Sequence, residues 1–222
     1  MDWLALSLSL RLGLFTVLCL IPLGLIVARA LAYRDFPGKA VAEALITLPL
    51  VLPPTVLGYY LLVAFGGASP VGQLWQNAFG KPLIFSFEAL LIASIIVNLP
   101  FAVQPMQRGF EAIPRDVRDA AACCGLPPLA AFWRVELPLA WPAIATALVL
   151  SFAHTLGEFG VVLMVGGSVP GETQTIAIAI YDRVQAFDNA AAARMSALLL
   201  AFSLTAVALT FALSRRVGRR TV

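Results

Sequence analysis

The feature that most constrains the fold is a series of long apolar segments without ionisable side chains. Residues 12–28, between Arg11 and Arg29, contain none, and a helix needs about 20 mostly apolar residues to cross a bilayer. Charged residues make up only 12% of the chain and hydrophobic residues 60%, whereas soluble domains carry roughly 25% charged residues. These patterns predict an all-α, polytopic transmembrane helix bundle.

We predict five membrane spans in a single transmembrane domain covering residues 1–222. A sixth span could come only from Thr173 to Ala193, but Asp182, Arg183 and Asp188 make that segment too polar to cross easily. The five predicted spans lie between Arg11 and Arg29, between Glu43 and Phe65, from Pro82 to Val103, from Ala143 to Val165, and between Arg194 and Arg215.

The basic residues are distributed in a way that orients these spans. With a cytoplasmic C-terminus, 11 of the 15 Lys and Arg residues lie on the inner side and 4 on the outer side. Cytoplasmic loops carry the excess of positive charge. We therefore expect a bacterial inner-membrane protein with its N-terminus outside and a cytoplasmic loop from about Gln104 to Trp141. Because the basic residues cluster at the ends of apolar segments, the net charge of +3 does not indicate nucleic-acid binding.

The cytoplasmic loop contains signals for one short helix. Pro114 suits a first helical position, Gly125 suits the C-cap, and the prolines that follow prevent continuation. A helix over 115–124 would be suited to docking into a groove on another protein, because one face carries only small side chains. An amphipathic helix lying at the lipid interface is the alternative. The small face consists of Val117, Ala120, Ala121 and Cys124.

This loop resembles the EAA loop of ABC importer permeases, whose pattern is E-A-A-x3-G-x9-I-x-L-P. The matching residues here are Asp119, Ala120, Ala121, Gly125, Val135, Leu137 and Pro138, with Asp in place of Glu and Val in place of Ile. The resemblance implies the type I ABC importer permease fold and a coupling helix that binds a separate cytoplasmic ABC ATPase subunit. It further implies a transporter of two permease chains, this chain and a second copy of itself, with two ATPase chains.

Two further segments resemble molybdate permeases, namely 48–58 and the region from His154 to Asp182. This resemblance implies import of molybdate, with tungstate as a related oxyanion, delivered by a periplasmic molybdate-binding protein. Sulfate permeases share parts of the pattern, including a Gly-Glu-Phe-Gly element, so a sulfate or thiosulfate permease is the alternative. In either case the resemblance implies a tetrahedral dianion as the substrate.

Two groups of residues are candidates for lining the pathway. Pro53 and Pro54 must break or kink the second span, and irregular backbone at membrane depth is tolerated only where protein or water surrounds it. In the fourth span, spacings of three, four and seven residues predict a polar stripe facing the bundle interior or a water-filled cavity. The alternative is that two of its members, one helical turn apart, pair for purely structural reasons. The stripe consists of Ser151, His154, Thr155 and Glu158.

The sequence contains no pattern typical of an enzyme. It has no HExxH, Walker or GxSxG element and only one histidine, so we predict neither a catalytic residue nor a cofactor or metal site. ATP hydrolysis would then belong to a partner subunit. A secondary transporter would normally show internal repeats, and we find no convincing repeat.

Overall fold

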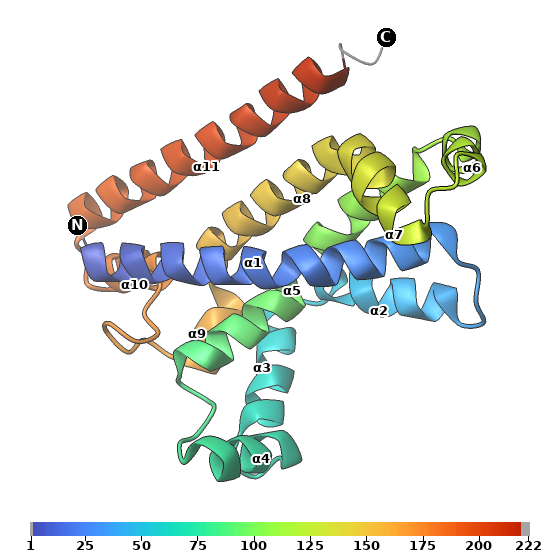
Figure 1. Cartoon of the computed structure of the whole chain (residues 1–222). Helices are drawn as coiled ribbons and strands as arrows, with labels where there is room; N and C mark the ends of the chain where they lie inside the picture. The colour runs from blue at the N-terminus through green and yellow to red at the C-terminus, as the bar shows by residue number, and fades with distance from the viewer. Residues whose placement is uncertain (1, 219–222) are drawn as a thin grey trace.

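The computed structural model describes the backbone of residues 2–218 and the side chains up to residue 208. In this part of the chain every regular element is helical and no strand occurs (Figure 1). The elements are α1 (Trp3–Tyr33), α2 (Lys39–Val51), α3 (Pro54–Phe65), α4 (Pro70–Phe79), α5 (Phe87–Glu111), α6 (Arg115–Cys123), α7 (Pro128–Ala131), the π-helical turn η1 (Phe132–Glu136), α8 (Leu137–Gly157), α9 (Gly160–Gly166), α10 (Ile176–Gln185) and α11 (Asn189–Gly218).

Four helical segments are individually long and apolar enough to cross a membrane: α1, α5, the run α7–η1–α8, and α11. Helices α2 and α3 form a fifth only if they are counted together, because the chain bends by 111° at the break between them. The prediction of five spans therefore holds when this bent pair is one span. Residues 173–193 contain helix α10 and the first residues of α11. Helix α10 has only 10 residues, which are too few to cross a membrane. The described residues therefore contain no sixth span.

The boundaries of two predicted spans are corrected. Helix α8 ends at Gly157, not at Val165, because Glu158 has extended backbone angles (φ −67°, ψ 128°) and a separate helix α9 follows. Helix α5 begins at Phe87, where the Ser86 side chain accepts a hydrogen bond from the Ala89 amide. It then continues to Glu111, beyond the predicted end at Val103. The predicted loop 104–141 is thus helical at both ends, and only 112–127 connects the long helices.

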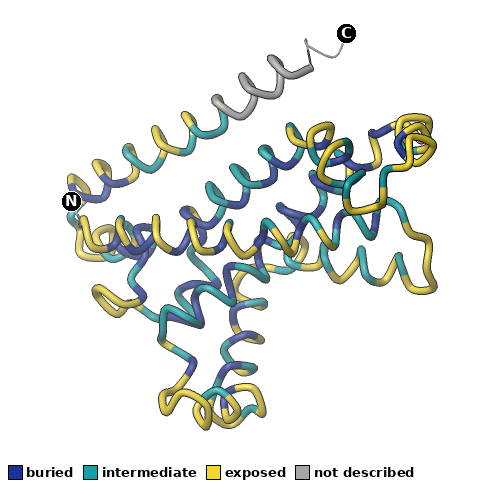
Figure 2. The backbone as a smooth tube through the Cα atoms, in the orientation of Figure 1, coloured by how far each residue is buried: buried dark blue, intermediate teal, exposed yellow. Residues whose placement is uncertain are grey.

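Helix α5 lies at the centre of the bundle and packs against α1, α2, α3, α8 and α9 (Figure 1). Its middle is the most buried part of the chain, whereas α4, α6 and much of α11 are exposed (Figure 2). Three apolar clusters contain residues of α5, and the largest joins α1, α5 and α8 around Val103, Met106 and Phe110. A fourth cluster joins α1, α10 and α11. A central helix buried on most sides, surrounded by helices with apolar outer faces, is the arrangement expected in a bilayer.

The break between α2 and α3 packs against the start of α9. A Cβ atom placed on Gly160 would lie 2.8 Å from the Pro54 Cβ atom, closer than two carbon atoms can approach. Only glycine at this position lets the start of α9 contact the start of α3. Since α9 begins just after the end of α8, the close contact brings the proline break next to the polar end of α8.

Candidate functional site

Helix α6, the predicted docking helix, ends in a Schellman motif. The Leu126 amide donates to the Ala121 carbonyl at 3.2 Å, and the Gly125 amide donates to the Ala122 carbonyl at 2.9 Å. Gly125 has φ +75°, and no atom lies within 4 Å of where its Cβ would be. The glycine is therefore needed for its backbone conformation rather than for space. The ends of α6 differ from the prediction: Pro114 is the N-cap rather than the first helical residue, and Cys124 is the C-cap, with Gly125 directly after it.

The small-residue face of α6 is largely free within the chain. Val117, Ala120 and Cys124 are exposed, and so is Asp119, the residue in the acidic position of the motif. Ala121 alone is buried, at 8% exposure. One small residue of this face is thus buried against the rest of the chain and the others are exposed; the tube of α6 is mostly in the exposed colour (Figure 2).

The second half of the motif continues into the helical run that leads to α8. Val135 is half-buried in the π-helical turn η1, Leu137 is half-buried at the start of α8, and Pro138 is exposed. Between them Glu136 is 5% exposed. Glu136 was not among the residues predicted from the sequence, although it is a lone acid within the pattern.

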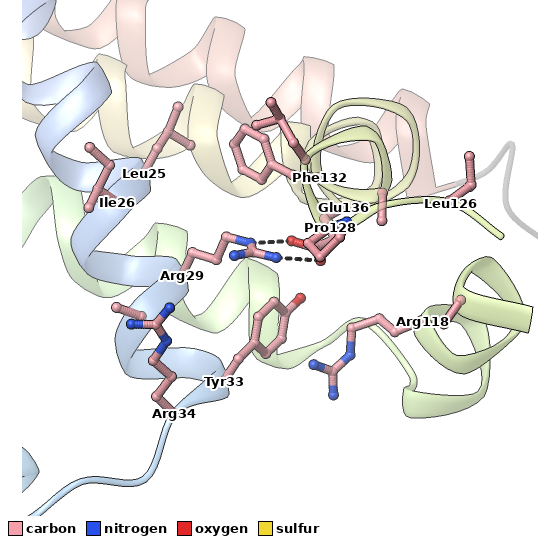
Figure 3. A pocket seen from close by; sticks show the side chains of 14 residues that line it. Leu25, Ile26, Arg29, Tyr33, Arg34, Arg118, Leu126, Pro128, Phe132 and Glu136 are labelled. Carbon is pink, nitrogen blue, oxygen red and sulfur yellow. Dashed lines mark hydrogen bonds and ion pairs between the residues drawn. The ribbon is translucent and has the colours of Figure 1, made fainter.

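Glu136 forms a two-point ion pair with Arg29 of α1. The Arg29 Nε atom donates to Oε2 at 2.5 Å and an Nη atom donates to Oε1 at 3.0 Å (Figure 3). Such paired hydrogen bonds are the strongest form of a charged contact. Nearby, the Arg118 guanidinium lies 4.0 Å from the centre of the Tyr33 ring. One ion pair and one cation–π contact therefore connect η1 and α6 to the same end of α1.

The proline break and the end of α8 form a second site. A cavity of about 140 Å³ is lined there by both sides of the break and by α5, α8 and α9. His154 and Glu158 both line it, together with Pro54, while Pro53 serves as the N-cap of α3 and does not. The lining residues are Pro49, Leu50, Leu52, Pro54, Val97, Phe101, His154, Glu158 and Val161.

His154 has three close neighbours, of which Phe101 and Glu158 also line the cavity. Its ring stacks on Phe101 with 4.2 Å between centroids, and Nδ1 lies 3.2 Å from the Asn98 Oδ1 atom. Its Nε2 atom lies 3.8 Å from the Glu158 Oε2 atom, beyond hydrogen-bond distance. The other carboxylate oxygen of Glu158 accepts a hydrogen bond of 3.1 Å from the Val161 amide. Glu158 thus caps α9 and has one oxygen directed to the histidine.

The other two members of the predicted stripe turn away from the cavity. Ser151 and Thr155 are 0% and 2% exposed. Thr155 contacts α5, whereas the Ser151 hydroxyl is buried and has no hydrogen-bond partner among the described residues. Thr155 Oγ1 accepts from Asn98 Nδ2 at 3.0 Å and donates to the Ser151 carbonyl at 2.8 Å. The stripe therefore divides into two buried residues that do not line the cavity and two residues that do. Asn98 bridges the two, and sequence reasoning missed it although it is a polar residue within an apolar span.

The sequence of this chain matches a described family over almost its whole length. Residues 20–219 match the family of the binding-protein-dependent transport system inner membrane component. The chain belongs to this family. It is an inner-membrane permease component of a transport system, and among the described residues its helices form the type I ABC importer permease fold.

Curated relatives agree with this assignment. The chain is 44% identical to the molybdenum transport system permease protein ModB of Azotobacter vinelandii, over 91% of this chain and 89% of that protein. It is 34% identical to the ModB of Escherichia coli strain K12, over 98% and 97%. The sulfate transport system permease protein CysW of Synechococcus elongatus is 32% identical, over 97% of this chain but 75% of its own length.

Solved structures support the same fold. A bacterial ABC transporter that imports alginate has a TM-score of 0.77 to this chain at 16% identity, over 96% of this chain and 78% of that chain. The MetNI methionine ABC transporter has a TM-score of 0.69 at 15% identity, over 97% and 94%. At these identities the likeness concerns the fold alone.

Proposed function

We propose that the chain is the membrane-spanning permease subunit of an ATP-driven importer of molybdate. The observation that carries the proposal is the full-length similarity to molybdenum permeases, which reaches 44% identity over 91% of the chain. The sulfate relative matches less closely and is longer than this chain. Tungstate, an oxyanion of the same shape and charge, would use the same route.

The assembly that we propose contains two copies of this chain, two ABC ATPase subunits and a periplasmic molybdate-binding protein. Helix α6 would bind the ATPase in the cytoplasm. Its exposed small face and the sharp stop at Gly125 support this role. The predicted orientation, with the N-terminus outside and the C-terminus inside, places α6 on the ATPase side.

The pathway that we propose passes the cavity at the α2–α3 break. His154 and Glu158 would be the polar groups that face it, and Pro54 would form the opposite wall. A carboxylate at this position disfavours a resident anion. In an importer whose binding protein supplies affinity, such a weak site speeds release, because conduction requires binding that is weak enough to let the substrate leave.

Gene deletion tests the substrate. We expect loss of molybdenum-enzyme activity at low external molybdate, and recovery at high molybdate, where another anion route supplies the metal. Sulfur auxotrophy relieved by cysteine would instead establish the sulfate permease. Complementation with the intact gene is the control.

Purification tests the assembly. Tagged chain extracted from the membrane should carry the ATPase subunit in equal amount, and the mass of the complex should equal two of each. ATP hydrolysis by the chain alone, or uptake without the ATPase, would contradict the proposal.

A further inference from the structure

A cavity between the end of α1 and the segment α6–α7–η1 lies outside the proposed pathway (Figure 3). Its volume is about 740 Å³, within the range of sites that hold organic ligands. Its wall includes apolar side chains of α1 and of the segment α6–α7–η1, together with the polar or charged residues Arg29, Tyr33, Arg34, Arg118 and Glu136. Neither the proposed transport route nor the proposed ATPase contact uses it.

The charged wall has an excess of positive charge. Glu136 neutralises Arg29, but among the described residues neither Arg34 nor Arg118 forms an ion pair. The Arg118 Nε atom is buried and has no hydrogen-bond acceptor. Burying a donor without an acceptor costs free energy, so a bound ligand that supplies an acceptor would stabilise the site. The positive charge of the two arginines favours an anionic ligand.

The rest of the wall is apolar and open to the outside of the bundle. Ile26 of α1 is 70% exposed and Leu129 of α7 is 69% exposed, and both line the cavity. With a rise of about 1.5 Å per residue, Ile26 lies about 12 Å nearer the bilayer centre than Arg34 along α1. Positive charge at the helix end and apolar surface about two turns deeper match an amphiphile with an anionic headgroup.

We propose that this cavity holds an anionic phospholipid of the cytoplasmic leaflet. Its phosphate would lie at Arg34 and Arg118, and the part of an acyl chain next to the headgroup would lie along Ile26 and Leu129. The leaflet follows from the proposed orientation. Basic pockets beside cytoplasmic helix ends are suited to such headgroups. Because Arg118 belongs to α6 and Arg34 ends α1, the lipid would bridge the docking helix to the transmembrane bundle.

Native mass spectrometry of the purified permease–ATPase complex tests the proposal directly. We expect the wild type to retain phosphatidylglycerol, and Arg34→Gln/Arg118→Gln to bind it on the order of 25-fold more weakly, from about 1 kcal/mol for each basic residue. Arg108→Gln, which removes an exposed arginine outside the cavity, should retain the lipid. Equal retention by the double variant and the wild type overturns the proposal.

Nanodiscs distinguish the sources of the anion. The thermal midpoint of the wild type should be higher in phosphatidylcholine mixed with phosphatidylglycerol than in phosphatidylcholine alone, and Arg34→Gln by itself should reduce this difference. Inorganic phosphate added to phosphatidylcholine discs should not reproduce it; if it does, the site takes a soluble anion and the lipid is excluded. A cavity closed by the second copy of the chain would give no lipid dependence. None of these readouts depends on the substrate, so failure here leaves the proposed transport function standing.

Discussion

A nearly buried glutamate stands at each end of helix α8, and the two are held very differently. Glu136, just before the helix, is 5% exposed and forms two charged hydrogen bonds with Arg29. Glu158, just after it, is 7% exposed and has one backbone donor, with His154 at 3.8 Å. The first carboxylate is fully paired, and the second keeps an oxygen facing a cavity. Burial alone therefore does not distinguish a structural clamp from a group available to a substrate; its partners do.

Glu136→Gln should have the largest effect of the changes considered. It leaves the Arg29 charge without its carboxylate, and breaking a buried pair costs about 3–5 kcal/mol. Since the Arg29 side chain is 34% exposed, we expect about 2 kcal/mol of lost unfolding free energy, measured by denaturant titration in micelles. Replacing both partners, as Arg29→Met/Glu136→Leu, should recover much of this stability. A double variant less stable than Glu136→Gln would contradict the view that the unpaired Arg29 charge causes the loss of stability.

Gly125→Val tests the docking helix at the same end of α8. Left-handed backbone disfavours a residue with a Cβ by about 1–2 kcal/mol, so the stop after α6 should shift and ATPase copurification should fall. Gly80→Val is the matched control, because Gly80 also has positive φ and open space around it but lies far from α6. Equal loss of copurification in both variants would show a general folding defect.

Thr155→Val probes the polar contacts near Glu158. The change keeps the shape but removes the acceptor for Asn98 Nδ2 and the hydroxyl donor to Ser151. We expect about 1 kcal/mol of lost stability, because the buried amide loses one of its partners. Since Asn98 also contacts His154, uptake should fall as well. Unchanged unfolding with Thr155→Val would mean that the network contributes nothing.

Glu158→Gln should change stability least, by less than about 0.5 kcal/mol. The amide oxygen can still accept the Val161 hydrogen bond, and no close charged partner is lost. Uptake per transporter should nevertheless fall, because the anion-repelling charge that we propose for release is gone. A stability loss as large as that of Glu136→Gln would abolish the contrast between the two ends of α8, and normal uptake would remove Glu158 from the pathway.

The membrane spans and the end of the docking helix could be predicted from the sequence, because each depends only on residues close together in the chain. Apolar length predicts the spans, and the left-handed stop at Gly125 follows from a glycine before two prolines. The motif from Asp119 to Pro138 identified the family, which the match over residues 20–219 confirmed. The roles of the individual motif residues stay predictions.

Only the tertiary structure decided which polar residues meet. Helical spacing put Ser151, His154, Thr155 and Glu158 on one face, yet the helix ends before Glu158 and only His154 and Glu158 line the cavity. The pairing of Arg29 with Glu136 joins positions 107 residues apart. No local pattern encodes such a contact, because it depends on how α1, α5 and α8 pack. Spans and turns are determined by short segments of the sequence, whereas the partners of a polar side chain and the lining of a cavity are determined by how the helices pack.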